Sequence, residues 1–479
     1  MKSGTIILVT CCLFSSSVSA SKWTQNPDQF NLFNFWLEDN GYDYRVGCEG
    51  DLDKVSPYFL HFCVDKDGNR VPKDPNNHLK PKRYKDRWSI PYKENPDRDT
   101  LIYYNYKNLH SHETGSRGET FQWDRYEVSG SMNPYQFTSE LRKEKLVDQQ
   151  LHSKAILSYL FYENGKIVVD EISPKDRFGD FIDNDTKLRS NSMGKSMASY
   201  VLGHAICEGY INDEEVRLDD WELVKGTLYE GQRLIDLLNM RSGDQKYVFG
   251  AYFRPRKSGQ NFNSGRNSTD AMYEIETRDL RKLMHRMQGL EKSKSTYNYT
   301  VVNTLLIQNY IIHKAGDNFD SLLKKVFVDK AQVADSVYFF KIPRSRPENG
   351  DINQMFFATR YDYLRIAKAM MDDWQNDTCV GQYLKRVYEK RQSKGSKGGD
   401  EPAFNNTKSY GGQFHFDYPS LEDRVILGLG GYGGQAILID VEKSRIAMVH
   451  SIHFNNSQYK YDVKGLLINP IKNGKFSSW

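Results

Sequence analysis

The segment SNSMGKSMASYVLGHAICEGYI, residues 190–211, contains Ser192 and Lys195 at Ser-x-x-Lys spacing. Apolar or small residues fill most positions after Ser192, a pattern that predicts a buried helix. The helix is expected to end near Glu208-Gly209, because glycine readily adopts the left-handed conformation of a helix cap. Residues three apart share one face of a helix, so the Ser192 hydroxyl and the Lys195 amine would lie within reach of each other.

This placement suits nucleophilic catalysis. A serine hydroxyl is a poor nucleophile until a nearby base takes its proton. Lysine can be that base when burial or a neighbouring positive charge lowers its pKa. The positive end of the helix would disfavour the proton on Lys195 and favour an alkoxide on Ser192. The alternative is a serine N-cap followed by a surface lysine, and the same spacing also begins at Ser19, Ser321 and Ser457.

The composition of the whole chain excludes some functions. The 479 residues carry 66 basic and 62 acidic side chains, for a formal net charge of +4. This near balance argues against nucleic-acid binding, and KPKRYKDR (residues 80–87) is interpreted as a solvated face. His110, His112 and Glu113 are interpreted as a surface loop, because no further ligand cluster accompanies them.

The N-terminus has the features of a secretory signal. One lysine precedes an apolar run from Ile6 to Phe14, and small residues lead to a cleavage site after Ala20. We therefore expect residues 1–20 to be a signal peptide and the mature protein to be exported, either periplasmic or secreted. No other segment approaches the ~20 apolar residues that a spanning helix needs, so no stable membrane insertion is expected.

Four cysteines remain after removal of the signal, a number that suits an oxidising compartment. Cys48 and Cys63 flank a short segment and can form a disulfide. Cys207 and Cys379 could pair with each other or be buried thiols, and the sequence leaves both alternatives open.

The rest of the chain divides by pattern. Residues 21–148 are aromatic and turn-rich, and we interpret them as a β-rich N-terminal region. Two apolar runs joined by Asn164-Gly165 then predict a β-hairpin. Helical patterns dominate residues 215–395, and strands return in RVILGLG, QAILIDV and RIAMVHSI, followed by a short helix. This order predicts an α+β fold in which both ends of residues 149–479 build one sheet around a helical insertion.

Four segments, in this order, resemble the motifs of serine β-lactamase-related hydrolases, which are similar to penicillin-binding proteins. The resemblance is strongest to the 6-aminohexanoate-oligomer hydrolase and class C branch, and it extends over roughly residues 150–479. It implies a β-lactamase/transpeptidase-like antiparallel sheet flanked by helices, with a helical subdomain. The segments are NSMGKSMASYVLGHAICEGYI, LIDLLNMRSGDQ (residues 234–245), TYNYTVVNTLLIQNYI (residues 296–311) and GGYGGQAILID (residues 430–440).

The resemblance implies roles for individual residues. Ser192 would be the nucleophile that forms an acyl-enzyme, with Lys195 as the base or its partner. Tyr299 would carry protons to the leaving group, although Tyr297 stays open as the catalytic tyrosine. The N–H groups of Ser192 and Gln435 would form an oxyanion hole. Tyr432, Gly433 and Gly434 would contact the substrate in place of the family's Lys-Thr-Gly.

Three features depart from the family. Val301 occupies the position where class C enzymes have an asparagine two residues after the tyrosine, and Asn303 lies close by. Tyr432 replaces a lysine that binds a substrate carboxylate. Asn298 begins an Asn-x-Ser/Thr sequon directly beside Tyr299, and a glycan there would obstruct the site.

The sequence therefore predicts an exported serine hydrolase that uses neither metal nor cofactor and acts on a small amide, ester or short peptide. Two alternatives remain. One is a D-Ala peptidase or penicillin-binding enzyme of the cell wall, and the other is a non-catalytic secreted binding protein on the same scaffold.

Overall fold

The computed structural model describes residues 62–64, 70–72, 125–175, 177, 182–249, 252–253, 280–341, 352–395, 407–451 and 460–478. The predicted signal peptide, Cys48, His110, His112 and the segment at residues 80–87 lie outside these ranges. In the N-terminal region, β1 (Phe62–Val64) and β2 (Arg70–Pro72) form an antiparallel pair.

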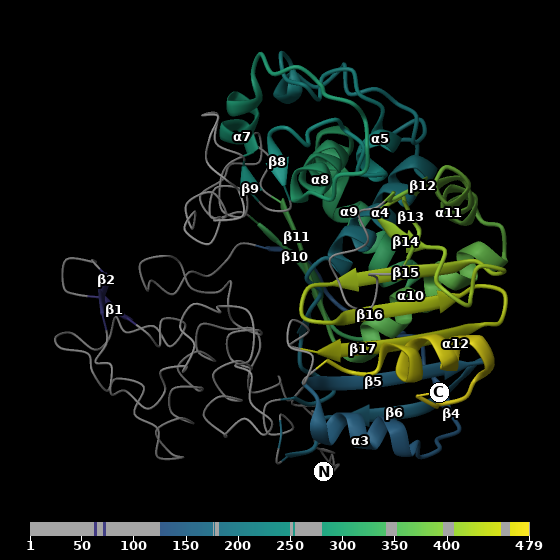
Figure 1. Cartoon of the computed structure of the whole chain (residues 1–479). Coiled ribbons are helices and arrows are strands. Elements are labelled where there is room, and N and C mark those ends of the chain that lie inside the picture. The colour runs from purple at the N-terminus through teal and green to yellow at the C-terminus, as the bar shows by residue number, and fades with distance from the viewer. Residues whose placement is uncertain are drawn as a thin grey trace, which may run out of the picture.

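A nine-stranded sheet dominates the described residues (Figure 1). Its spatial order is β12-β13-β14-β15-β16-β17-β5-β6-β4, and every pairing is antiparallel except that of β4 with β6. The strands are β4 (Thr138–Ser139), β5 (Ile156–Glu163), β6 (Lys166–Ile172), β12 (Gln392–Ser393), β13 (Ser409–Gly411), β14 (Phe414–Phe416), β15 (Ile426–Gly431), β16 (Gln435–Asp440) and β17 (Arg445–Ser451).

The prediction that both ends of the chain build this sheet is confirmed. β17 pairs with β5 over most of its length, with Met448 opposite Leu160. The predicted hairpin is also present, because Glu163 pairs with Lys166 across the β5–β6 turn. Asn164 and Gly165 have φ angles of 49° and 88°, the left-handed values that a two-residue hairpin turn requires.

Side chains alternate between the two faces of the sheet and create two hydrophobic cores. Ile437 and Ile439 belong to the larger core, which also contains residues of α4 (Met193–Cys207) and α10 (Arg360–Gln375). Ala436 and Leu438 belong to the smaller core, under α3 (Lys145–Ser153), η9 (Lys464–Ile468) and α12 (Asn469–Asn473). In Figure 1, α12 lies in front of the sheet and α10 behind it.

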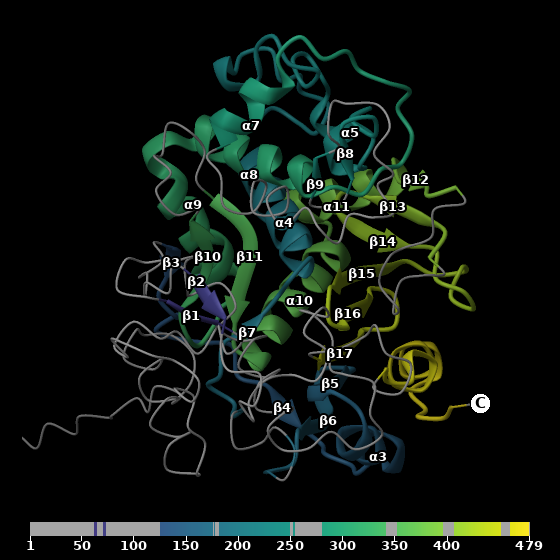
Figure 2. The same cartoon turned by 60° about the vertical axis from the view of Figure 1, so that its left-hand side comes forward.

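The described residues also include further helices and a second large sheet (Figure 2). The second sheet has the order β3-β10-β11-β7. Its strands are β3 (Arg125–Val128), β7 (Leu188–Arg189), β10 (Val337–Lys341) and β11 (Ile352–Ala358). The pair β8 (Val248–Phe249) and β9 (Tyr252–Phe253) stands apart from it. The remaining helices are η4 (Glu222–Val224), α5 (Leu234–Leu238), α7 (Leu280–Met287), α8 (Val301–Ala315), η6 (Gly316–Asn318), α9 (Phe319–Lys324), η7 (Lys325–Lys330) and α11 (Cys379–Glu389).

The last part of the N-terminal region, from residue 125 onwards, packs into the two larger sheets. β3 pairs with β10, β4 pairs with β6, and α3 begins at Lys145 and runs past residue 148. The end of the N-terminal region thus contributes strands to both larger sheets. The boundary between residues 148 and 149 stays a prediction.

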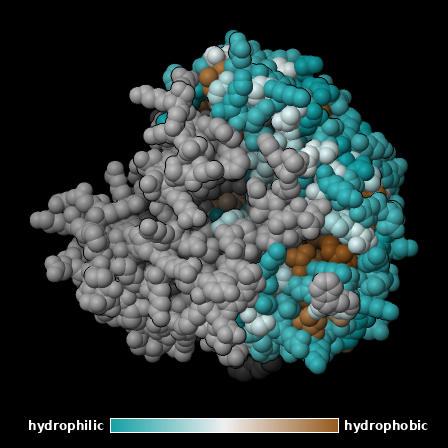
Figure 3. All heavy atoms as spheres, in the orientation of Figure 1, coloured by the Kyte–Doolittle hydropathy of each residue, from teal (hydrophilic) through white to brown (hydrophobic). Residues whose placement is uncertain are grey.

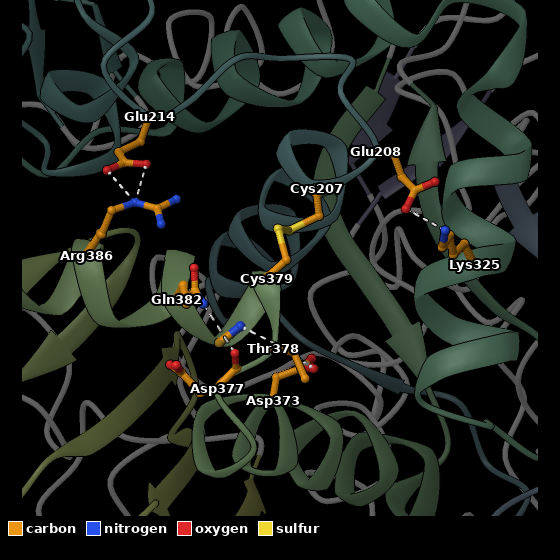
Figure 4. Close-up of a disulfide and its surroundings, with 11 residues drawn as sticks. Cys207, Glu208, Glu214, Lys325, Asp373, Asp377, Thr378, Cys379, Gln382 and Arg386 are labelled. Carbon is orange, nitrogen blue, oxygen red and sulfur yellow. Dashed lines mark hydrogen bonds and ion pairs between the residues drawn. A yellow bond between two sulfur atoms is a disulfide. The ribbon is translucent and has the colours of Figure 1, made fainter.

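One disulfide is present among the described residues. It joins Cys207, the last residue of α4, to Cys379, the first residue of α11 (Figure 4). The sequence left this pairing open, and the structure resolves it. The ion pairs of Glu208 with Lys325 and of Glu214 with Arg386 lie around it.

The hydropathy of the surface differs between the large sheet and the helical part of the described residues. Figure 3 shows hydrophobic residues at the surface over the strands near α12, whereas the helical part around α5 and α8 is mainly hydrophilic on the same face. A search of the described helices for an apolar span as long as a bilayer is thick finds none. Within the same residues, no three His, Cys, Asp or Glu side chains gather as metal ligands would.

Candidate functional site

Ser192 and Lys195 lie one turn apart at the start of α4. Ser192 is the N-cap residue, half-buried, and its side chain makes no capping hydrogen bond. The Lys195 N–H donates to the Ser192 carbonyl at 3.1 Å. The Lys195 side chain is not on the surface, because the residue is only 1% exposed. The alternative of a serine N-cap followed by a surface lysine is therefore right about the position of Ser192 and wrong about Lys195, which is buried.

Lys195 meets Tyr299 inside the molecule. Its Nζ lies 5.2 Å from the centroid of the Tyr299 ring, within the range of a cation–π contact. Tyr299 is half-buried and directly precedes Thr300, the N-cap of α8. The three predicted residues thus lie at the N-terminal ends of two helices, Ser192 and Lys195 at α4 and Tyr299 at α8. These helices begin more than one hundred positions apart in the chain.

The second candidate tyrosine has a different environment. Tyr297 is buried and belongs to a small hydrophobic cluster with Met240 and Tyr410, against which Tyr299 packs from the side. The ring centroids of Tyr297 and Tyr410 are 5.6 Å apart. Burial raises the pKa of Tyr410 well above its usual value, and the neighbouring Tyr299 and Tyr297 add to the shift. The contact with Lys195 favours Tyr299 as the catalytic tyrosine, which stays a prediction.

A second copy of the Ser-x-x-Lys spacing provides a comparison. Ser321 and Lys324 lie in α9, and both residues are exposed. This copy therefore lacks the burial that distinguishes Lys195. The copies at Ser19 and Ser457 lie outside the described residues.

The third motif lies directly against the turn that carries Ser192. Tyr432, Gly433 and Gly434 form the turn between β15 and β16, and both glycines have positive φ angles, of 91° and 87°. The side-chain amide of Asn191 donates a hydrogen bond to the Tyr432 carbonyl. A Cβ on Gly431 would lie 2.4 Å from the Ser190 carbonyl oxygen, so only glycine permits this approach.

The predicted oxyanion hole depends on this contact between turns. Gln435 begins β16 opposite Gly431, and its buried side chain hydrogen-bonds with the backbone N–H and carbonyl of Ser451 on β17. These side-chain hydrogen bonds hold Gln435 in place as the first residue of β16. The pairing of its N–H with that of Ser192 as an oxyanion hole stays a prediction.

Val301, which replaces the asparagine of class C enzymes, and the nearby Asn303 are both buried. Val301 is the first residue of α8 and is 8% exposed. Asn303 is fully buried, and its Nδ2 lies 3.5 Å from the Met240 sulfur. The Asn303 Oδ1 has no hydrogen-bond partner in the described part of the chain. Asn303 is thus directed at Met240.

Asn298, the sequon residue beside Tyr299, is interior. It is 4% exposed, and its Nδ2 donates to Asp244 Oδ1 at 2.7 Å and to the Val248 carbonyl at 3.2 Å. A glycan attaches through this same nitrogen and replaces one of its two hydrogens, so a glycosylated Asn298 could not keep both bonds. This arrangement argues against a glycan that would obstruct the site.

Two residues near the site were missed by the sequence analysis. Asn191 carried no signal beyond its place before Ser192. Asp244 follows the Met-x-Ser-Gly turn, and nothing in the sequence distinguishes it from Asp236 in the same motif.

The comparisons with known proteins bear on the fold. No protein-family model matches the chain, and no curated protein matches it either. A solved structure from Bacillus anthracis, provisionally assigned as a 6-aminohexanoate-dimer hydrolase, is similar with a TM-score of 0.56 at 14% sequence identity, covering 76% of this chain and 94% of that one. The predicted β-lactamase/transpeptidase-like fold is thereby confirmed.

Two further solved structures align over a similar share of the chain. The D-amino acid amidase of Ochrobactrum anthropi has a TM-score of 0.47 at 14% identity, covering 68% of this chain and 97% of its own. The class C β-lactamase of Rhodobacter sphaeroides has a TM-score of 0.46 at 12% identity, with the same two coverages. Similarity at this level adds nothing to the argument about activity.

Proposed function

We propose that the protein is a serine hydrolase that cleaves amide or ester bonds through an acyl-enzyme on Ser192. One observation carries the proposal. Ser192 begins α4, Lys195 is buried one turn later, and its Nζ lies 5.2 Å from the ring centroid of Tyr299 at the start of α8. This arrangement supports Ser192 as the nucleophile, with Lys195 and Tyr299 as the proton carriers.

The chemistry of the proposal follows from these positions. Ser192 Oγ attacks the substrate carbonyl, and its proton passes to the pair formed by Lys195 and Tyr299. The charge that develops on the carbonyl oxygen is stabilised by the N–H groups of Ser192 and Gln435. Tyr299 then gives a proton to the leaving group, the C–N or C–O bond breaks, and water hydrolyses the acyl-enzyme.

The proposed substrate is a small amide, ester or short peptide. The name of the Bacillus anthracis protein describes the hydrolysis of a linear amide, and we extend only that bond type to this chain. Tyr432 at the position of the family's lysine supports a substrate without a free carboxylate. Export from the cytoplasm belongs to the same proposal and rests on the sequence of residues 1–20.

Labelling with a fluorophosphonate serine probe tests the proposal. We expect one adduct on Ser192 in the wild type, none in Ser192→Ala and slower labelling in Tyr299→Phe, all measured by intact mass and peptide mapping. Ser321→Ala is the matched control, because it removes the serine of an exposed Ser-x-x-Lys copy, and it should label like the wild type. A mass adduct that persists in Ser192→Ala contradicts the proposal.

The same protein samples separate the two alternatives. Saturable binding of a fluorescent penicillin to Ser192 would favour a D-Ala peptidase or penicillin-binding enzyme. A folded wild type that reacts with neither the fluorophosphonate nor an acylating ester would favour a secreted binding protein.

A further inference from the structure

We propose that Asp244 is the positioning residue for Tyr299, holding the tyrosine beside Lys195 by binding the residues on both sides of it. The inference rests on the proposed function, since it concerns the residue assigned to proton transfer. Asp244 does not itself contact the reacting atoms in this proposal.

The hydrogen bonds of Asp244 define its role. Oδ1 accepts from Nδ2 of Asn298 at 2.7 Å, and Oδ2 accepts from Oγ1 of Thr300 at 3.4 Å. These two donors are the immediate neighbours of Tyr299 in the chain. Oδ2 also accepts from the Tyr229 hydroxyl at 3.0 Å, which ties the same carboxylate to the loop before α5.

Asp244 is itself held firmly. The carboxylate is fully buried, and the Asp244 carbonyl accepts from the N–H groups of Tyr247 and Val248. The preceding Gly243 has a φ of 76°, and its carbonyl accepts from both the N–H and the Oγ of Ser293. The turn that presents Asp244 is thus fixed from two sides.

The geometry calls for a carboxylate. An ionised carboxylate only accepts hydrogen bonds, and both of its oxygens are used here by donors. Burial raises the pKa of Asp244, whereas the hydrogen bonds from Asn298 and Tyr229 lower it. An asparagine would present an NH2 group to one side of this arrangement. Facing Asn298, it would set two donors against each other and lose that bond; facing Thr300 and Tyr229, it would make both hydroxyls accept where they now donate.

A second buried carboxylate provides a matched control. Asp373 is 1% exposed and accepts from a tyrosine hydroxyl and a threonine hydroxyl, those of Tyr200 and Thr378, each at 2.6 Å. It lies near the far end of α4 and is flanked by the disulfide rather than by Tyr299 (Figure 4). Asp373 also pairs with Lys330, whose Nζ lies 2.6 Å from Asp373 Oδ1. Asp373→Asn therefore makes the same chemical change as Asp244→Asn and removes an ion pair besides, which makes it a stringent control for general destabilisation.

The experiment compares two substrates with one acyl group, p-nitrophenyl butyrate and butyryl p-nitroanilide. Nitrophenolate leaves without a proton, whereas the anilide nitrogen must gain one as its C–N bond breaks. A displaced Tyr299 should therefore lower kcat for the anilide at least tenfold more than kcat for the ester, a size in keeping with general acid catalysis. We expect this larger loss of kcat for the anilide in Asp244→Asn and in Tyr299→Phe, with KM little changed. Asp373→Asn should keep the wild-type ratio of the two kcat values.

Each outcome decides the inference. If the ratio of kcat for the anilide to kcat for the ester is the same in Asp244→Asn and Asp373→Asn, the inference is wrong. If Tyr299→Phe still lowers this ratio in that case, the proposed function stands without the inference. Labelling that persists in Ser192→Ala overturns the proposed function itself. Where the anilide is cleaved too slowly to measure, crystal structures of both variants decide: Tyr299 displaced from Lys195 in Asp244→Asn alone supports the inference, and an unmoved Tyr299 overturns it.

Discussion

The side-chain amide of Asn191 donates a hydrogen bond to the backbone carbonyl of Tyr432, across 241 positions of the chain. This bond joins the turn before Ser192 to the turn before Gln435, the two turns that carry the predicted oxyanion-hole donors. Asn191 also has a φ of 47°, a left-handed conformation that asparagine tolerates better than most residues. One residue therefore contributes both a backbone conformation and a contact between motifs.

Replacing Asn191 separates these two contributions. Asn191→Gly keeps the left-handed backbone and removes only the hydrogen bond, so we expect a loss of about 1 kcal/mol in the free energy of unfolding. Asn191→Ala also adds the strain of a positive φ, about 1–2 kcal/mol more. Urea denaturation measures both losses. Both variants should also label more slowly with the fluorophosphonate, and labelling at the wild-type rate would show that the contact does not set the oxyanion geometry.

The disulfide between Cys207 and Cys379 should contribute strongly to stability. It closes a loop with a sequence separation of 172 and joins the ends of α4 and α11. We expect the double variant Cys207→Ser/Cys379→Ser to lose about 2–5 kcal/mol in the free energy of unfolding. Urea denaturation without reductant is the measurement, and an unchanged midpoint would contradict the expectation.

The same variant tests whether the disulfide affects the site. Ser192 and Cys207 are fifteen positions apart, a rise of about 22 Å along α4. At a temperature where the variant is folded, we therefore expect Ser192 to label at nearly the wild-type rate. A lost adduct in the folded variant would show that the far end of the helix controls the nucleophile.

The sequence predicted the features that depend on local signals. The dipeptide Asn164-Gly165 predicts its own turn, and the short apolar runs near residues 426–451 predict buried strands from a few neighbouring residues. The pairing of Cys207 with Cys379 was not decided, because it depends on how α4 and α11 pack. The contacts of Asn191 and Asp244 were missed for the same reason, since a hydrogen bond between distant segments exists only after the helices and sheets have assembled.

Buried histidines should make the protein less stable in acid. Burial lowers the pKa of His450 to about 3 and that of His204 to about 4. An unfolded histidine titrates near about 6.5, so below that pH the unfolded chain binds protons that the folded chain does not. The free energy of unfolding should therefore fall as the pH drops from about 6.5 towards 4, by up to about 1.4 kcal/mol per pH unit for each group.

His450→Leu tests this sign and size. Both ring nitrogens of His450 lack a hydrogen-bond partner in the part of the chain that the structure describes. Leucine does not titrate. Between pH 6.5 and 4.5, the free energy of unfolding of the variant should therefore fall by about 2–3 kcal/mol less than that of the wild type. His152→Leu, at an exposed position of α3, is the control and should keep the wild-type slope. Equal slopes in all three proteins would mean that His450 is not a source of the acid sensitivity.

The burial of Asn298 predicts which sequons carry glycans when the protein is secreted by a glycosylating host. Both hydrogens of Asn298 Nδ2 are used, one by Asp244 and one by Val248, so a glycan there would remove one of these bonds and force the buried chain beside Tyr299 outwards. Asn376, at the exposed end of α10, is the matched control. Peptide mapping of the folded, secreted protein should find Asn298 unmodified and Asn376 glycosylated. A glycan on Asn298 in protein that still labels at Ser192 would show that the site forms without the bond from Asn298 to Asp244.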